Sequence, residues 1–161
     1  MESIFETYNQ LVRVFLFNAF FIFLLLTIIS IFKKNLIELH VKIDERGAAF
    51  FALGIAKASN NYVAVICTSG TAAANFHPAA LEAFHSQCKL LIITADRPEK
   101  LRKTGANQTT NQVNLYQSIP THDFAVPIEI AHLLSTGPVH LNPQFEEPLI
   151  AANKIDWLSG L

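Results

Sequence analysis

Apolar runs alternate with mixed segments along most of the chain, and their lengths predict the secondary structure. Three short runs, LIELHV at 36–41, YVAVIC at 62–67 and LLIIT at 90–94, have the length and composition of buried strands. The segments 46–59 and 71–86 between them have the length of helices. Apolar strands that alternate with helices indicate a parallel sheet covered on both faces. We therefore predict an α/β fold of three layers.

Weaker patterns predict the remaining elements. A helical turn is expected at 98–103, short helices at 111–117 and 128–134, and a last strand at PVHLN, 138–142. Pro78 lies inside the second long helix, where a proline removes one backbone hydrogen bond.

A longer apolar run, VFLFNAFFIFLLLTIISIF at 14–32, lies near the N-terminus and contains no charge. At about 1.5 Å per residue, a helix of this length nearly crosses a hydrocarbon core of about 30 Å. Acidic residues rather than a basic cluster precede it, unlike a signal peptide. Lys33 and Lys34 follow it, which would place the next domain on the cytoplasmic face. We predict a hydrophobic helix within a leader at 1–34, and whether it anchors the chain in a membrane stays open.

Composition narrows the range of functions. The formal net charge of −1 argues against a nucleic-acid surface. Cys67 and Cys88 lie in or beside apolar stretches without a CxxC pattern, which favours buried free thiols. The six histidines are scattered singly, so no metal site built from this chain alone is expected. We expect one domain over 35–150 and a C-terminal tail at 151–161.

The helix predicted at 46–59 is apolar nearly all round. Only Arg46, Lys57 and Ser59 interrupt it with polar or charged side chains. A helix of this kind is buried on more than one side. A small domain has difficulty covering it alone, so we expect a subunit interface there.

Three segments begin where predicted strands end: IDERGAAF at 43–50, CTSGTAAANF at 67–76 and TADRPEKLRKTGANQ at 94–108. In an open parallel sheet, residues just past the carboxyl ends of the strands line the ligand crevice. The sequence therefore predicts that a carboxylate, a helix start and an arginine meet at one edge of the sheet.

Each of these groups has two interpretations when judged from the residues alone. Glu45 suits proton transfer, but an acid at a helix start is also favoured by the helix dipole. The small residues Thr68, Ser69 and Gly70 would let backbone amides face a ligand, or they form an ordinary cap. Arg97 could hold a carboxylate bidentately or form an exposed ion pair. No GxGxxG or GxxxxGK[ST] motif is present, so dinucleotides and nucleoside triphosphates are not indicated.

Together with GPVHLNPQFEEPL at 137–149, these segments closely resemble one enzyme family. They are similar to the N-terminal pyrimidine-binding domain of the thiamine-diphosphate-dependent synthases of menaquinone biosynthesis, the 2-succinyl-5-enolpyruvyl-6-hydroxy-3-cyclohexene-1-carboxylate synthases. The resemblance runs from about Leu36 to Leu149. It implies a thiamine-diphosphate pyrimidine-binding domain, here incomplete, that acts on 2-oxoglutarate and isochorismate.

The resemblance also implies roles for individual residues. Glu45 matches the glutamate that activates the cofactor by exchanging a proton with N1′ of its pyrimidine ring. The cofactor-binding positions are Glu45, Thr68, Ser69, Gly70 and Asn75. The substrate-binding positions are Arg97, Asn107 and Gln108, and an arginine suits the dicarboxylate substrates.

Several family features are missing from this sequence. The SPGSRS loop is replaced by the apolar run at 14–32, and the stretch from Thr121 to Gly137 is shorter than in the family. No GDG…N motif is present, so the diphosphate and Mg²⁺ are expected to bind to a complementary domain or chain. The family assembles its site across a homo-oligomer, and the resemblance therefore implies that this chain alone is inactive.

Two interpretations stay open. The chain is either half of a synthase site, or a non-catalytic, membrane-tethered interaction module that keeps the fold. The TADRP and GANQ wording makes a third interpretation, an acetolactate synthase or a 2-oxoacid decarboxylase, the weaker match.

Overall fold

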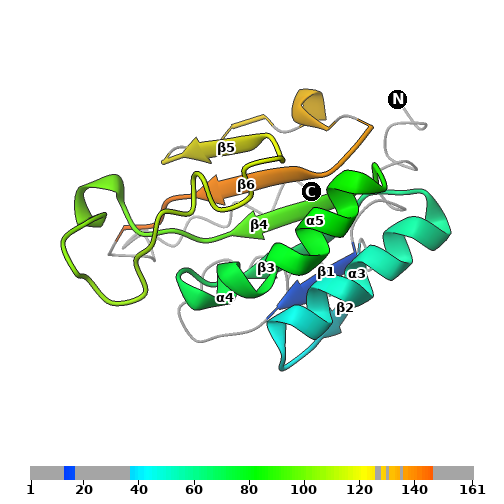
Figure 1. Ribbon diagram of the computed structural model, residues 1–161, viewed down its shortest axis with the longest axis horizontal. Helices are drawn as coiled ribbons and strands as arrows, with labels where there is room; N and C mark the ends of the chain where they lie inside the picture. The colour runs from blue at the N-terminus through cyan, green and yellow to red at the C-terminus, as the bar shows by residue number, and fades with distance from the viewer. Residues whose placement is uncertain (1–12, 17–36, 126–127, 130, 135, 147–161) are drawn as a thin grey trace, which may run out of the picture.

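The computed structural model describes residues 13–16, 37–125, 128–129, 131–134 and 136–146. They form an α/β domain around a parallel four-stranded sheet of order β3-β4-β6-β5 (Figure 1). Its strands are β3 (Val63–Cys67), β4 (Leu90–Thr94), β5 (Thr121–Phe124) and β6 (Val139–Pro143). A parallel pair, β1 (Arg13–Leu16) and β2 (Glu38–Val41), adjoins this sheet, and β1 lies beside β3.

The strands predicted from apolar runs are confirmed. The run at 36–41 contains β2, and the runs at 62–67 and 90–94 contain β3 and β4. Strands β3 and β4 pair in parallel from Val63 with Leu90 to Cys67 with Thr94. Every residue of β3 is buried, as expected for a strand covered on both faces.

Helix α3 (Glu45–Ser59) has defined ends. The Asp44 carboxylate accepts a hydrogen bond of 2.6 Å from the Gly47 N–H, which satisfies one donor of the first turn. At the other end Asn60 adopts the left-handed conformation, with φ of 54°, and its N–H donates to the Ala56 carbonyl. The buried side of α3 consists mainly of alanines, so the helix approaches the sheet closely.

The second predicted helix is two helices, which corrects the continuous helix expected at 71–86. Helix α4 (Thr71–Asn75) ends at Phe76, and α5 (His77–His85) begins directly after it. Pro78 therefore lies in the first turn of α5, where a backbone N–H has no helical partner to lose. The restart of the helix accommodates the proline without a broken hydrogen bond.

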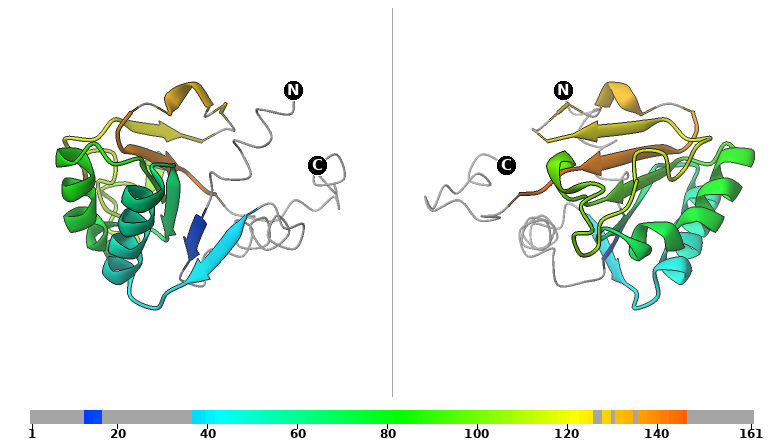
Figure 2. Two further views of the ribbon diagram at one scale, coloured as in Figure 1. Left: turned by 90° about the vertical axis from the view of Figure 1, so that its right-hand side faces the viewer. Right: turned by 60° about the vertical axis from the view of Figure 1, so that its left-hand side comes forward.

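Helices α3, α4 and α5 cover one face of the sheet (Figure 2). The core between them joins small helix residues such as Ala49 and Ala79 to the strand residues Val65 and Ile92. On the opposite face a second cluster contains Tyr62, Ala64, Ile66, Leu91, Val139 and Leu141. The described residues show no second helical layer over that face, so the three-layer prediction is confirmed only for the sheet and one helical layer.

Strand β1 corrects part of the N-terminal prediction. Residues 14–16, expected to begin a hydrophobic helix in a separate leader, belong to a strand that pairs with β2. A run that is apolar throughout does not distinguish a buried strand from a helix, because neither periodicity is visible. Residues 17–32 lie outside the described residues. None of the helices in the described part of the chain is long and apolar enough to cross a membrane.

Two further helix predictions differ from the structure, one strand was not predicted, and one predicted turn is present. Residues 111–117 form successive turns rather than a helix, because hydrogen bonds such as Leu115 N–H to the Gln112 carbonyl span three residues, not four. Strand β5 was not predicted, since its sequence THDF has no apolar run. Of the helix expected at 128–134, the described residues show only the 3₁₀ turn Ala131–Leu133. The turn expected at 98–103 is the 3₁₀ helix Glu99–Leu101.

Candidate active site

The carboxyl ends of the central strands meet at one edge of the sheet, as predicted. Cys67 and Thr94 are paired at the ends of β3 and β4, and Asp96 forms a bridge with Gln144 just beyond β4 and β6. The segment that follows β3, which contains Thr68 and the residues predicted to contact the cofactor, therefore lies beside the segment that follows β4.

Glu45 is the first residue of α3 and is half-buried. Its carboxylate lies close enough to the end of β3 to influence Cys67. Burial raises the pKa of the Cys67 thiol, and the negative charge of Glu45 raises it further. The Glu45 side chain makes no hydrogen bond to another described residue, whereas the neighbouring Asp44 carboxylate is used as the helix cap. Asp44 thus has a structural role, whereas no such bond to a described residue engages the Glu45 carboxylate.

The loop 68–70, predicted to bind the cofactor and here called the cofactor loop, contacts the segment 97–108, predicted to bind substrate, at Gly70 and Gln108. Gly70 has φ of 79°, and a Cβ added to it would lie 3.2 Å from the Cα of Gln108. A larger residue would therefore be strained in its backbone and crowded by Gln108. Gln108 itself has φ of 55°, which is uncommon for a residue other than glycine. The structure thus brings together two of the positions predicted for cofactor and substrate.

Gln112 explains how the cofactor loop is held, and sequence reasoning missed it. Its Oε1 accepts a 2.8 Å hydrogen bond from the Gly70 N–H, and its Nε2 donates to the Ala95 carbonyl at 3.1 Å. The Gly70 N–H is therefore already bonded within the chain, and the expectation that this loop contacts a cofactor stays a prediction. The side chain of Gln112 is fully buried.

Asn142, on β6, is the centre of a buried polar network behind this loop. Its Oδ1 accepts hydrogen bonds of 2.8 Å from Thr94 Oγ1 and 2.8 Å from Gln112 Nε2. Its Nδ2 donates to Asp96 Oδ2 at 2.9 Å and to Asp123 Oδ1 at 2.7 Å. All four hydrogen-bonding positions of the Asn142 amide are thus occupied, which rigidifies the sheet edge.

His140 extends the network along β6. Its Nε2 lies 2.7 Å from Thr94 Oγ1, and its Nδ1 lies 3.0 Å from Thr121 Oγ1. Because the Thr94 hydroxyl donates to Asn142, it accepts from His140, which assigns the neutral ring with its proton on Nε2. Burial lowers the pKa of His140 to about 3. The ring is thus a neutral structural link and not a proton carrier near neutral pH.

Arg102 and Asp123 form the outer part of the network. The two Nη atoms of Arg102 donate to the two carboxylate oxygens of Asp123 at 3.1 and 2.9 Å. Nη2 of Arg102 also lies 2.8 Å from Asp96 Oδ2. Partial burial works to raise the pKa of Asp123, but hydrogen bonds from Arg102 and Asn142 outweigh it and lower the pKa. No local pattern in the sequence indicates this ion pair, because its partners are 21 residues apart.

The other predicted site residues differ in burial, since Thr68 and Ser69 are buried whereas Asn75 and Asn107 are exposed. Arg97 is half-buried directly after β4, and its backbone N–H donates to Asp96 Oδ1 at 2.7 Å. Asn75 is exposed at the end of α4, and Asn107 and Gln108 are exposed in the loop after Arg102. These three amide side chains form no hydrogen bond with another described residue.

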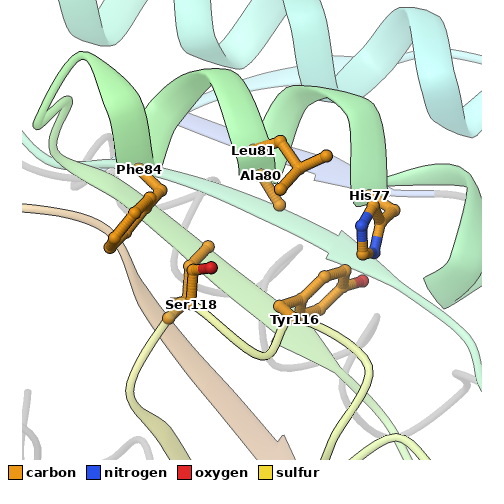
Figure 3. Close-up of a pocket in the computed structure, with 7 residues that line it drawn as sticks. His77, Ala80, Leu81, Phe84, Tyr116 and Ser118 are labelled. Atoms are coloured by element: carbon orange, nitrogen blue, oxygen red, sulfur yellow. The ribbon is translucent and has the colours of Figure 1, made fainter.

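A small depression lies away from this edge, between α5 and the segment that contains Tyr116 (Figure 3). His77 and Tyr116 face each other at one end of it, with ring centroids 5.9 Å apart, and Phe84 lies at the other end. The Tyr116 hydroxyl is bonded to the Ala73 carbonyl, and burial raises its pKa. The depression is mostly apolar and has room for about one water molecule, so it is not a cofactor site.

The described residues contain no cluster of three histidine, cysteine or acidic side chains that could hold a metal ion. The carboxylates nearest the site, Asp96 and Asp123, are taken up by Arg102 and Asn142.

Comparison with known proteins identifies the family of this chain. The family model for the thiamine pyrophosphate enzyme, N-terminal TPP binding domain, matches residues 22–115, which is more than half of the chain. The chain belongs to this family. The match begins inside the apolar run at 14–32 and includes α3, β3, β4 and the polar loops that follow them.

Three relatives that match this chain share one name and are all synthases. A 2-succinyl-5-enolpyruvyl-6-hydroxy-3-cyclohexene-1-carboxylate synthase from Nocardioides sp. is 52% identical over 125 residues, which are 77% of this chain and 22% of that protein. The synthase from Thermobifida fusca is 49% identical over 71% of this chain and 24% of its own length. That from Bacillus cytotoxicus is 44% identical over 76% and 24%. The match thus covers about a quarter of these relatives, and the resemblance seen in the sequence is confirmed for that region.

Proposed function

We propose that this chain supplies the pyrimidine-binding half of the active site of a thiamine-diphosphate-dependent synthase. The reaction would join decarboxylated 2-oxoglutarate to isochorismate in menaquinone biosynthesis. The observation that carries the proposal is Glu45, a carboxylate at the start of α3 that is half-buried and makes no hydrogen bond to another described residue. It occurs in a chain that is 52% identical to a synthase of this kind over 125 residues.

Glu45 would act on the aminopyrimidine ring of thiamine diphosphate. Its carboxylate would hold and release a proton at N1′ of the ring, as a general acid–base group. Bound thiamine diphosphate supplies the carbon nucleophile of the reaction. The loop of Thr68, Ser69 and Gly70, fixed from behind by Gln112, supports the ring, and Asn75 borders it.

Arg97, Asn107 and Gln108 would hold the dicarboxylate substrates. Arg97 follows β4 at the same edge of the sheet, and its guanidinium suits a carboxylate because it can donate two parallel hydrogen bonds. Gln108 is pressed against Gly70, so a substrate held by it would lie next to the cofactor loop. Asn107 precedes it on the same exposed turn.

A complementary chain that binds the diphosphate and Mg²⁺ would cover the outer side of α3. Phe50 and Phe51 are 45% and 39% exposed, and together with Gly54, Ile55 and Ala58 they line an open apolar hollow. We call these five residues the α3 face. Large exposed apolar side chains that cluster in this way favour an interface with another protein surface. In a full synthase the same surface would contribute to a homo-oligomer.

Calorimetry tests the half-site proposal. The full chain alone, titrated with thiamine diphosphate and Mg²⁺, should give no saturable heat, because the metal ligands are expected on the partner. Addition of a complementary chain with a GDG…N motif should produce saturable binding and turnover of 2-oxoglutarate with isochorismate. A dissociation constant in the micromolar range or tighter for the chain alone would contradict the half-site. Cofactor binding by the mixture without turnover would favour the non-catalytic module instead.

A further inference from the structure

Arg102 lies between the residues proposed to bind substrate. Arg97 precedes it by five positions and Asn107 and Gln108 follow it, so the segment 97–108 carries all three. The segment 97–108 is an irregular loop without a strand or an α-helix of its own. It contains a 3₁₀ turn, and Lys103 and Gly105 have positive φ angles of 65° and 81°. A segment of this kind keeps its shape only through contacts with the rest of the domain.

Arg102 makes charge-assisted hydrogen bonds to two carboxylates. Its guanidinium donates to both oxygens of Asp123 and to Asp96 Oδ2, all at 2.8 to 3.1 Å. Its side chain is 16% exposed and that of Asp96 is fully buried. Charge-assisted, bidentate hydrogen bonds at a site shielded from water are stronger than exposed ion pairs. Arg102 thus connects the middle of the segment to β5 and to the end of β4.

The two carboxylates also depend on Arg102. Asp96 and Asp123 lie close together, since both accept hydrogen bonds from the same Nδ2 of Asn142. The positive charge of Arg102 compensates both carboxylates. Without it, two negatively charged side chains would be held together by the neutral Asn142 amide. Removal of one partner from a buried ionic group is strongly destabilising, because the remaining charge is left uncompensated.

We propose that Arg102 is a positioning residue that fixes the segment 97–108 against the sheet edge and so sets the places of Arg97, Asn107 and Gln108. It touches neither substrate nor cofactor. The part of the proposal that concerns substrate rests on the proposed function, whereas the fixing of the segment is a property of the domain itself. Measurement on the chain without any activity therefore separates the two.

Hydrogen–deuterium exchange of the full chain tests this proposal. Arg102→Met keeps the apolar stem and removes the guanidinium, and it should speed amide exchange in 97–108 by about tenfold or more while β3 stays protected. Lys100→Met is the matched control on the same segment. It breaks the ion pair of Lys100 with Glu146, whose side chains are 64% and 56% exposed, and should change exchange by less than about twofold.

Two more variants separate positioning from a general loss of stability. Arg102→Lys keeps the charge but replaces the planar fork of two nitrogens that matches the Asp123 carboxylate with a single nitrogen, so it should restore part of the protection lost in Arg102→Met. Asp123→Asn added to Arg102→Met removes the charge repulsion and should also restore part of it. If Arg102→Met speeds amide exchange in the whole domain, the exchange rates of Arg102→Lys provide the test. The proposal expects Arg102→Lys to speed exchange in 97–108 more than in 63–67. An equal change of rate in the two segments, or no change in either, would overturn the proposal.

Discussion

Two regions of this domain differ in how far the chain completes them by itself. At the edge formed by β4 and β6, the buried polar groups around Asn142 find their partners within the chain. On the α3 face, Phe50 and Phe51 remain exposed beside a glycine and an alanine. In the first region the Asn142 amide is fully hydrogen-bonded, and Nε of Arg102 is the buried atom of this network that lacks a partner among the described residues. The second region presents exposed apolar side chains.

This difference separates the region whose polar groups bond within the domain from the surface where we propose that a partner binds. Buried polar groups are costly when they lack hydrogen bonds, so the network at the sheet edge must form inside the domain. Apolar surface costs less to leave exposed and is covered on association. Glu45 lies between the two regions, at the start of α3 and beside the end of β3. Its position fits a residue that works where two chains meet.

The largest expected effect concerns Glu45. In a complex with a chain that supplies the diphosphate site, Glu45→Gln should lower turnover by about 10²–10⁴-fold, the range of general acid–base groups. The amide fills the same space but cannot exchange a proton with N1′. The rate of C2 proton exchange of the bound cofactor, followed by NMR, should fall in parallel.

Asp44→Asn is the matched control for Glu45→Gln. Asparagine caps a helix as well as aspartate does, so this variant should keep turnover within about threefold of the parent. Arg97→Lys should differ from both, with a raised KM for the dicarboxylate substrate and nearly unchanged C2 exchange. If Glu45→Gln left C2 exchange within about threefold of the parent, the role assigned to Glu45 would be wrong.

The next prediction concerns the pH dependence of stability and tests whether the buried His140 ring at the sheet edge is neutral. The pKa of His140 is lowered to about 3 by burial, whereas an unfolded histidine titrates near 6.5. Below pH 6.5 the unfolded chain binds a proton that the folded chain refuses, so this contribution to stability is present above 6.5 and is lost as pH falls towards 3. From pH 7 to 5 the free energy of unfolding should drop by about 2 kcal/mol through this group.

Urea denaturation at several pH values measures this drop. His140→Gln keeps a donor and an acceptor between Thr94 and Thr121 and should remove most of the pH dependence. His85→Gln, a change at an exposed histidine on α5, should leave it as in the parent. Equal slopes in the parent and His140→Gln would show that the ring is not held neutral by burial.

The smallest effect concerns the α3 face. Phe50→Ser should weaken binding of the complementary chain by about tenfold, since exposed aromatic side chains at an interface commonly carry more than 1 kcal/mol. It should change the free energy of unfolding of the chain alone by about 0.5 kcal/mol or less. Analytical ultracentrifugation of the mixture measures the first and urea denaturation the second.

Leu81→Ser provides the comparison for Phe50→Ser. Leu81 is 42% exposed on α5, similar to Phe50, but lies outside the α3 face. Its loss should leave partner binding within about twofold of the parent. Equal weakening by both variants would mean that the α3 face has no special part in association.

Local sequence was sufficient where one interaction decides the structure. The apolar runs predicted β2, β3, β4 and β6, and Asp44 and Asn60 lie at the two ends of α3 as its caps. Burial of a strand and capping of a helix depend on neighbours along the chain, so the pattern contains them. The meeting of the strand ends at one edge followed from the parallel alternation alone.

The errors arose where distant residues compete. Residues 14–16 are apolar enough for a helix, but strand pairing with β2 decides their structure. Residues 111–117 have no helix because Gln112 and Tyr116 are held by partners on other elements, at Gly70 and Ala73. Strand β5 has too few apolar residues to be recognised and exists through its pairing with β6.

By itself the sequence determined the α/β alternation, the polar segments at the strand ends and the family to which they belong. The tertiary structure alone decided which polar groups are used up inside the domain. Gln112 occupies the Gly70 amide, and Arg102 occupies Asp96 and Asp123, across separations that leave no trace in local pattern. The physical reason is that hydrogen bonds and ion pairs depend on distance in space, whereas periodicity records only distance along the chain.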